Sequence, residues 1–392
     1  MRTLTHELGW DRRMNVQEKK RKRLNLKTGA AEVAVGIALL VTFYVTWVTQ
    51  WVPYLWAGAL ALGLILTGKG IFDFVRAPQF PDFKKGMQPT FKELRFTLRK
   101  IRESPLLLVG VTLVSFFIAI AILAPVLAPP VTPQGFPLPD PFEIYFDTNE
   151  KYVSMPQPPS AKYPFGTTTG AINLYYGCIW GTIYAFRLGI IVIAATLSIG
   201  ISLGLIAAYY GGLMDEIIMR FTDIVLAFPG LILTMALIVA LSRRGWSNID
   251  AAILGITLVG WPGYTRLIRG EVLRVKTEDY VEASRASGSS DLRIMLRHIL
   301  PNAIYPIIIV ASLDFGSIVL FAAALSFLGL GAPPRYADWG QLISQAQDWI
   351  SYGLQYWWTF IIPGVFITLF CLGWNLLGDA FRDILDPLYR RK

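Results

Sequence analysis

Cysteine and histidine are nearly absent from this 392-residue sequence, which contains two of each. Cys178 and Cys371 lie far apart and form no Cys-X-X-Cys pair, and His6 and His298 have no ligating residues near them in sequence. These absences exclude a disulfide scaffold and a metal site of the usual spacing. We therefore expect no cofactor bound by the chain itself.

Charge is also scarce, since only 16% of the residues are charged while 54% are hydrophobic. A helix that crosses the roughly 30 Å hydrocarbon layer needs about 20 mostly apolar residues, because lipid offers the backbone no hydrogen-bond partner. The sequence predicts an all-α polytopic membrane protein with about eight transmembrane helices, near residues 30–50, 52–74, 105–128, 187–210, 222–242, 250–267, 302–329 and 358–378.

Lys and Arg are concentrated in alternate connections between these spans. A cytoplasmic N-terminus places 30 of the 36 in the inside segments 1–29, 68–104, 211–222, 266–301 and 379–392. The other six are Lys151, Lys162, Arg187, Arg243, Arg244 and Arg335. Because cytoplasmic loops carry excess positive charge, we expect both termini in the cytoplasm. The net charge of +9 then reports orientation in the membrane and not binding to nucleic acid.

The N-terminal part divides into a basic cytoplasmic segment, residues 1–29, and a transmembrane helix pair, residues 30–83. The remainder, residues 84–392, begins with apolar residues at helical spacing among basic ones over 84–103. This pattern predicts an amphipathic helix on the cytoplasmic leaflet, with a solvated charged linker as the alternative.

Two further features concern the connections. The predicted extracytoplasmic loop 130–186 starts with a proline-rich stretch, which indicates an irregular cap or docking loop, or a plain connector. Gly211-Gly212 predicts a tight cytoplasmic turn, and Gly200 with Gly204 gives the preceding span a face of small residues for close helix contact.

The charged segment 266–301 has the cap pattern of two short helices. Residues 277–279 suit a helix start, Gly288 suits its left-handed end, residues 290–291 can cap a second helix, and Pro301 begins the next element. A rigid pair of helices held between two spans presents a fixed shape to a soluble partner. Many cytoplasmic loops contain two short helices, so this pattern alone is weakly specific.

A more specific signal lies in the residues themselves. Glu282-Ala283-Ser284, then Gly288, then His298-Ile299-Leu300-Pro301 resembles the EAA loop of ABC importer permeases, which docks into a groove on the ATPase subunit. The chain departs from that pattern at Ser284, where a second alanine is usual, and at His298, where generic members have an aliphatic residue. The resemblance implies that the ATPases are coupled through Glu282, Ala283, Ser284, Gly288, His298 and Pro301.

Over about residues 100–392 the chain is similar to the dipeptide and oligopeptide permeases of the peptide/nickel ABC importer family. The motifs include residues 207–212, Asp223, residues 260–264, 325–331 and 375–379. The six-helix core of that family fits the last six predicted spans, so the first two are additional. Between residues 168 and 186 the chain departs from the family, and no residue role is carried over there.

The resemblance implies a non-enzymatic subunit of an importer for peptides or related solutes. Its partners would be a second related permease, two ATP-binding subunits that carry the ATP and Mg, and an extracytoplasmic substrate-binding protein. Oligosaccharides are an alternative cargo. Six aromatic residues either stack on sugars or form a membrane-interface belt: Trp339, Trp349, Tyr352, Tyr356, Trp357 and Trp358.

Other classes of protein fit less well. An ion-coupled secondary transporter usually needs ionisable residues inside the membrane, and among the last six predicted spans the clear example is Asp314. Asp314 either lines the translocation path or makes an interhelical hydrogen bond. Gly68-Lys69 mimics part of a phosphate-binding loop, but Gly70 replaces the required Ser or Thr, so a separate chain must hydrolyse ATP.

Overall fold

The computed structural model describes residues 105–131, 138–144 and 155–385. The predicted basic segment 1–29, the helix pair 30–83 and the amphipathic helix 84–103 lie outside the described residues. Parts of the proline-rich stretch and the chain end at 386–392 lie outside them too.

Within the described ranges the regular elements are helices apart from one short two-stranded hairpin. Five helices are long and apolar enough to cross a membrane, namely α4 (Pro105–Leu127), α5 (Leu174–Tyr210), α8 (Asn248–Val275), α12 (Tyr305–Phe327) and α15 (Trp358–Leu385). A sixth span results if α6 (Gly212–Leu226) and α7 (Gly230–Ser242) are counted together. The all-α polytopic class is therefore confirmed, with five or six candidate spans in the described part of the chain.

Helix α5 starts well before the predicted span of 187–210. Its first turn is capped by Asn173, whose Oδ1 accepts hydrogen bonds from the backbone N–H groups of Tyr175 (3.0 Å) and Tyr176 (3.3 Å). The residues from Leu174 to Ala185 are buried almost without exception. The aromatic and polar side chains of this first part pack against protein, and they interrupt the apolar run by which a span is recognised in sequence. Hydropathy therefore located only the second part of the helix.

The predicted single span of 222–242 is wrong in shape, because α6 begins at Gly212 and meets α7 at an angle of 90°. Proline has no N–H to donate, and it disfavours helical geometry in the residue before it. Pro229 therefore separates the two helices. The backbone N–H of Ala227 donates to Asp223 (3.0 Å) and that of Leu233 to Pro229 (3.0 Å), so the bend leaves these groups satisfied.

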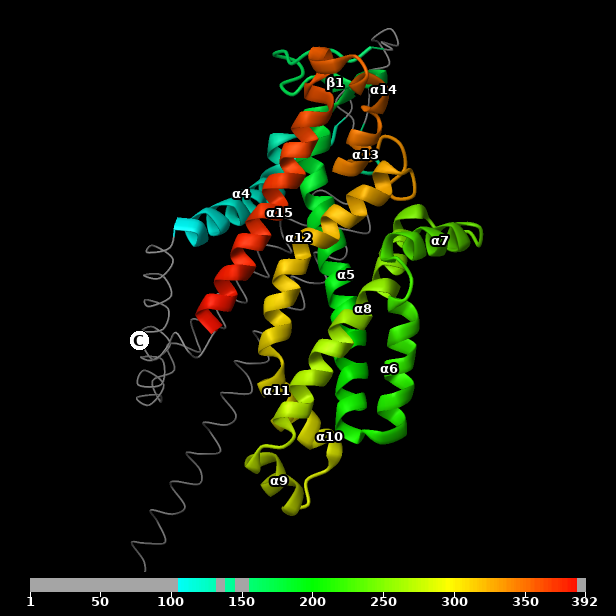
Figure 1. Cartoon of the computed structure of the whole chain (residues 1–392). Coiled ribbons are helices and arrows are strands. Elements are labelled where there is room, and N and C mark those ends of the chain that lie inside the picture. The colour runs from blue at the N-terminus through cyan, green and yellow to red at the C-terminus, as the bar shows by residue number, and fades with distance from the viewer. Residues whose placement is uncertain (1–104, 132–137, 145–154, 386–392) are drawn as a thin grey trace, which may run out of the picture. The chain divides into compact units, whose positions relative to one another are not determined.

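Helices α5 and α8 pack against each other over much of their length (Figure 1). A Cβ at Gly200 would lie 2.6 Å from Tyr264 Cβ, and a Cβ at Gly204 would lie 2.2 Å from Ile268 Cγ2. The predicted small-residue face of α5 is thus confirmed, and α8 is its partner. The predicted tight turn also follows α5, with φ of 68° at Gly211 and 54° at Gly212.

We expect Gly204→Val to lower the thermal unfolding midpoint of the detergent-solubilised protein. Overpacking typically costs about 1–3 kcal/mol, and here the added Cβ would also meet the carbonyl oxygen of Thr265 at 2.5 Å. The matched control is Gly270→Ala in α8, where nothing lies within 4 Å of the new Cβ. An unchanged midpoint in Gly204→Val would contradict the close approach of α5 and α8.

One end of the bundle carries a group of short elements that we call the cap (Figure 1). It consists of β1 (Thr167–Thr168), η1 (Thr169–Ala171), β2 (Ile172–Asn173), α13 (Trp339–Ser344), α14 (Gln347–Ile350) and η3 (Gly353–Tyr356). Strand β1 pairs antiparallel with β2. Residues 138–144 join it, since Ala337 N donates to Phe142 O and Ile144 N donates to Arg335 O, each at 2.7 Å.

Three of the tryptophans considered for sugar stacking have another role in the cap. Their indole N–H groups donate inward: Trp339 to the carbonyl of Cys178 (3.1 Å), Trp349 to Thr169 Oγ1 (2.7 Å) and Trp358 to the carbonyl of Thr167 (3.2 Å). These three side chains fasten α5, the hairpin and α13–α15 to one another.

The carboxyl group of Asp338 is buried in the cap. Asp338 lies in the connection that joins the membrane-spanning helices α12 and α15 along the chain. Its Oδ2 accepts a hydrogen bond from Gln341 N at 3.1 Å and so caps α13. Burial raises the pKa of Asp338 to about 6, because the charged form loses its hydration. The folded state therefore favours the protonated form more than the unfolded state does.

Unfolding free energy should thus fall as the pH rises from about 4 to about 6, and stay lower above that range. Asp338→Asn keeps an acceptor for Gln341 N and removes the charge. We expect it to be up to about 3 kcal/mol more stable than wild type at pH 8, with little difference at pH 4. The control is the exposed Asp348→Asn, and thermal unfolding at both pH values is the measurement. Equal midpoints for Asp338→Asn and wild type at pH 8 would show that the buried Asp338 carboxylate does not destabilise the folded state.

Candidate functional site

The segment between α8 and α12 contains the two short helices predicted from sequence. Helix α9 (Asp279–Ala286) is followed by α10 (Asp291–Ile294), and the chain continues through a π-helical turn, η2 (Met295–Ile299), into α11 (Leu300–Ala303). We call residues 276–304 the bracket. Helix α8 continues to Val275, so the predicted inside segment 266–301 begins within a long helix.

Gly288 ends α9 as predicted. Its φ of 76° lies in the left-handed region, its N–H donates to Arg285 O (3.0 Å), and the next N–H, of Ser289, donates to Ser284 O (3.2 Å). These two bonds form the Schellman arrangement that glycine favours at helix ends. Nothing lies within 4 Å of a Cβ at this position, so the requirement for glycine is one of backbone conformation and not of space.

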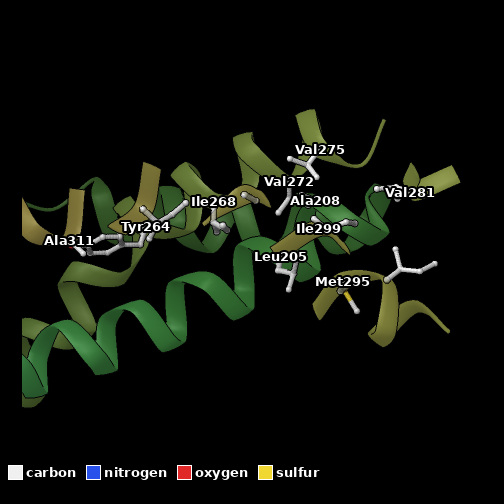
Figure 2. Close-up of a cluster of buried hydrophobic side chains, with 13 residues drawn as sticks. Leu205, Ala208, Tyr264, Ile268, Val272, Val275, Val281, Met295, Ile299 and Ala311 are labelled. Carbon is white, nitrogen blue, oxygen red and sulfur yellow. The ribbon is translucent and has the colours of Figure 1, made fainter. Parts of the chain in front are cut away.

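The bracket is attached to the bundle through buried apolar side chains (Figure 2). Val281 of α9, with Ile294 and Ile299 of the following helices, is fully buried. They belong to one cluster with Leu205 and Ala208 of α5, Ile268, Val272 and Val275 of α8, and Met295. Full burial of an aliphatic side chain contributes about 1.5–3 kcal/mol, so the bracket is packed firmly against the ends of α5 and α8.

The other face of the bracket is open. Glu282, Ala283 and Gly288 are exposed, as is Pro301 in the first turn of α11, while Ser284 and His298 are half-buried. The fold thus gathers the sequence-predicted residues in one short segment, with Glu282 to Ser284 on a single helix.

Three apolar side chains missed by the sequence analysis are also exposed on the bracket. Tyr280 is 43% exposed, Leu292 63% and Leu296 52%. The sequence could not single them out, because only the structure shows which apolar residues of the bracket are buried. Large apolar side chains on a segment that is already well packed suit contact with another protein.

Ion pairs tie α8 to α6 beside the bracket. Arg269 donates to both carboxylate oxygens of Asp215, each at 2.6 Å, and Arg266 donates to Asp223 Oδ1 at 2.5 Å. A bidentate arginine–carboxylate pair fixes orientation as well as distance. Because Asp215 and Asp223 lie near the two ends of α6, these pairs hold α6 in register with α8 along its length.

Asp314 of α12 is half-buried and has a partner on another helix. The hydroxyl of Tyr264, in α8, donates to Asp314 Oδ2 at 2.7 Å. This bond is what the packing alternative for Asp314 requires. The alternative role in the translocation path stays a prediction.

Comparison with known proteins places these features in a family. The model of the binding-protein-dependent transport system inner membrane component matches residues 200–391. Among solved structures, the MetNI methionine ABC transporter in an inward-facing conformation has a TM-score of 0.43 and 20% identity, covering 54% of this chain and 97% of that one. An oligopeptide transport system permease protein of Bacillus subtilis is 31% identical over 74% of this chain and 88% of its own. A dipeptide transport system permease protein of Alkalihalophilus pseudofirmus is 35% identical over 75% of this chain and 89% of its own length. The chain belongs to this family of inner-membrane permeases.

The permease is thus a multi-pass inner-membrane protein and the non-catalytic transmembrane subunit of a binding-protein-dependent ABC importer. Membership of this family implies ATPase and binding-protein partners. Across the described ranges, no group of three or more His, Cys, Asp or Glu side chains is placed to hold a metal ion.

Asp314→Asn separates the two roles of this carboxylate in the permease. The amide oxygen still accepts from Tyr264, so the packing role predicts normal assembly and uptake, whereas Asp314→Leu should lose about 1–3 kcal/mol of stability. Uptake in vesicles and thermal unfolding of the purified complex are the measurements. Abolished uptake in a normally assembled Asp314→Asn permease would instead assign the charge to the translocation path.

Proposed function

We propose that this permease pairs with a second, related permease to form a path for peptides or related solutes, and that the bracket couples the path to the ATPases. The supporting observation is the bracket's two-sided character. Its inner side is buried in one cluster with α5 and α8, while its outer side exposes Tyr280, Leu292 and Leu296 beside Glu282 and Ala283.

This arrangement suits mechanical coupling. ATP and Mg bind on the partner ATPases, and closure of those subunits displaces the bracket. Because Val281 and Ile299 are packed with side chains of the long helices, a displacement of the bracket becomes a rigid-body displacement of α5 and α8. Glu282, Ala283, Ser284, Gly288, His298 and Pro301 form or shape the docking surface.

The domain organisation that goes with this function has three parts. Residues 1–29 are a cytoplasmic segment, 30–83 an additional helix pair, and 84–392 a six-span importer core made of α4, α5, the bent pair α6–α7, α8, α12 and α15. The distribution of Lys and Arg supports cytoplasmic termini. With that orientation the cap, to which the loop 130–186 contributes β1, η1 and β2, lies on the side where a binding protein delivers cargo.

Peptide cargo is supported by the relatives, whose names state dipeptide and oligopeptide transport. For the oligosaccharide alternative, six aromatic side chains were considered as a surface that stacks on sugars. Trp339, Trp349 and Trp358 donate their indole N–H groups inward, and Trp339 is only 1% exposed, so these residues give it no support.

Gly288→Val tests the coupling assignment. A β-branched residue is strained at a φ of 76°, so the turn between α9 and α10 should rearrange, and ATP-driven uptake should fall at least tenfold. The measurements are uptake of a radiolabelled dipeptide and recovery of the ATPases with the purified permease.

Gly288→Asn is the matched control, since asparagine tolerates the left-handed conformation, and it should retain most uptake. Membrane insertion and the size-exclusion profile of the Gly288→Val permease should stay normal because the position is exposed. Full ATP-driven uptake by Gly288→Val would show that the bracket does not couple the ATPases.

A further inference from the structure

Tyr209, near the end of α5, contacts both α9 and α10 of the bracket. Its hydroxyl donates to Asp291 Oδ1, at the start of α10, at 2.6 Å. The guanidinium group of Arg285, in the last turn of α9, lies over its ring with the central carbon 5.9 Å from the ring centroid. One aromatic side chain thus contacts α9 through its face and α10 through its hydroxyl group.

The same end of α5 makes another polar contact with the bracket. Lys276, the first bracket residue, donates from Nζ to the carbonyl of Ala208 at 2.7 Å. Ala208 is fully buried in the cluster shown in Figure 2. A cation beside a carbonyl in the last turn of a helix is favourable, since that end carries a partial negative charge. The end of α5 therefore contacts α9 through Arg285, α10 through Asp291, and the first bracket residue, Lys276.

Helix α5 is not adjacent to the bracket in sequence. The bracket follows α8 and precedes α12, so these two helices are joined to it by the chain itself. Helix α5 is instead connected to the bracket through side-chain contacts. At its other end, the carbonyl of Cys178 accepts a hydrogen bond from the indole N–H of Trp339 (3.1 Å). It runs from the cap to the bracket without interruption (Figure 1).

We propose that Tyr209 is a positioning residue that locks α5 to the bracket, so that a movement of the bracket is passed directly to the cap along α5. This inference rests on the proposed coupling function of the bracket. The buried cluster keeps the bracket on the bundle, and Tyr209 sets the position of α9 and α10 relative to α5. The hydrogen bond to a carboxylate and the contact with a guanidinium group are both directional, whereas the apolar contacts are not.

The adjacent Tyr210 provides a matched control. It is 55% exposed, and its only contact of note in the described structure is a ring contact, edge to face, with Tyr209 (5.2 Å between centroids). Removing its hydroxyl group should leave the bracket untouched. Tyr209→Phe and Tyr210→Phe therefore delete the same atom from neighbouring positions, and only one of the two atoms bridges α5 and α10.

The experiment uses the full transporter, purified with its partners and reconstituted in vesicles. Three quantities are measured for wild type, Tyr209→Phe, Tyr209→Ala and Tyr210→Phe: recovery of the ATPases, the basal ATPase rate, and the amount of a radiolabelled dipeptide taken up per ATP hydrolysed. We expect normal recovery and a basal rate within about twofold of wild type in all variants. Uptake per ATP should fall about fivefold in Tyr209→Phe and further in Tyr209→Ala, and stay at the wild-type value in Tyr210→Phe.

A double variant sharpens the result. If Tyr209 acts through Asp291, then Tyr209→Phe combined with Asp291→Asn should lose no more uptake per ATP than the more impaired single variant. Additive losses would overturn the assignment of Asp291 as the partner of Tyr209.

Two outcomes would overturn the positioning role. In the first, uptake per ATP is unchanged in Tyr209→Ala. In the second, Tyr209→Ala loses the ATPases or the folded permease, which would make Tyr209 a general stabilising residue. Either result leaves the coupling function standing if Gly288→Val still lowers uptake at least tenfold. Full uptake by Gly288→Val would instead remove the proposed function on which this inference rests.

Discussion

The close approach of α5 to α8 is the contact on which the other features of the bundle depend. Gly200 and Gly204 leave no room for a side chain, so Tyr264 and Ile268 of α8 lie directly on the backbone of α5. At this separation Tyr264 reaches Asp314 on α12, and Ile268 enters the same buried cluster as the bracket. One pair of small residues thus fixes the positions of three helices and of the segment that joins two of them.

Polar contacts then give this apolar bundle a defined register. Asp215 and Asp223 of α6 pair with Arg269 and Arg266 of α8. Apolar packing alone tolerates small slides between helices, whereas paired charges and directional hydrogen bonds do not. The half of the bundle next to the bracket carries most of these contacts, and the cap carries the inward-directed indole groups. Each end of α5 also has polar contacts, with Trp339 at the cap and with Asp291 and Lys276 at the bracket.

The sequence alone was sufficient where one residue type meets one physical demand. Lipid requires long apolar helices, so α4, α12 and α15 were located closely, and a left-handed helix end requires glycine, so Gly288 was placed correctly. The start of α5 was missed because its first turns are buried by protein instead of lipid. The bend at Pro229 was hidden inside a continuous apolar run. Tyr209 gave no local signal, since its partner Asp291 lies 82 residues away.

The length of α5 has a consequence for where its two ends lie. At 1.5 Å per residue, its 37 residues extend about 55 Å, against a hydrocarbon thickness of about 30 Å. Even with a tilt of about 20°, more than one-third of the helix stands clear of the acyl chains. Its buried, aromatic-rich first turns suit such a position, because protein and not lipid surrounds them. A helix of this length is long enough for the cap at one end and the bracket at the other to stand outside the hydrocarbon layer at the same time.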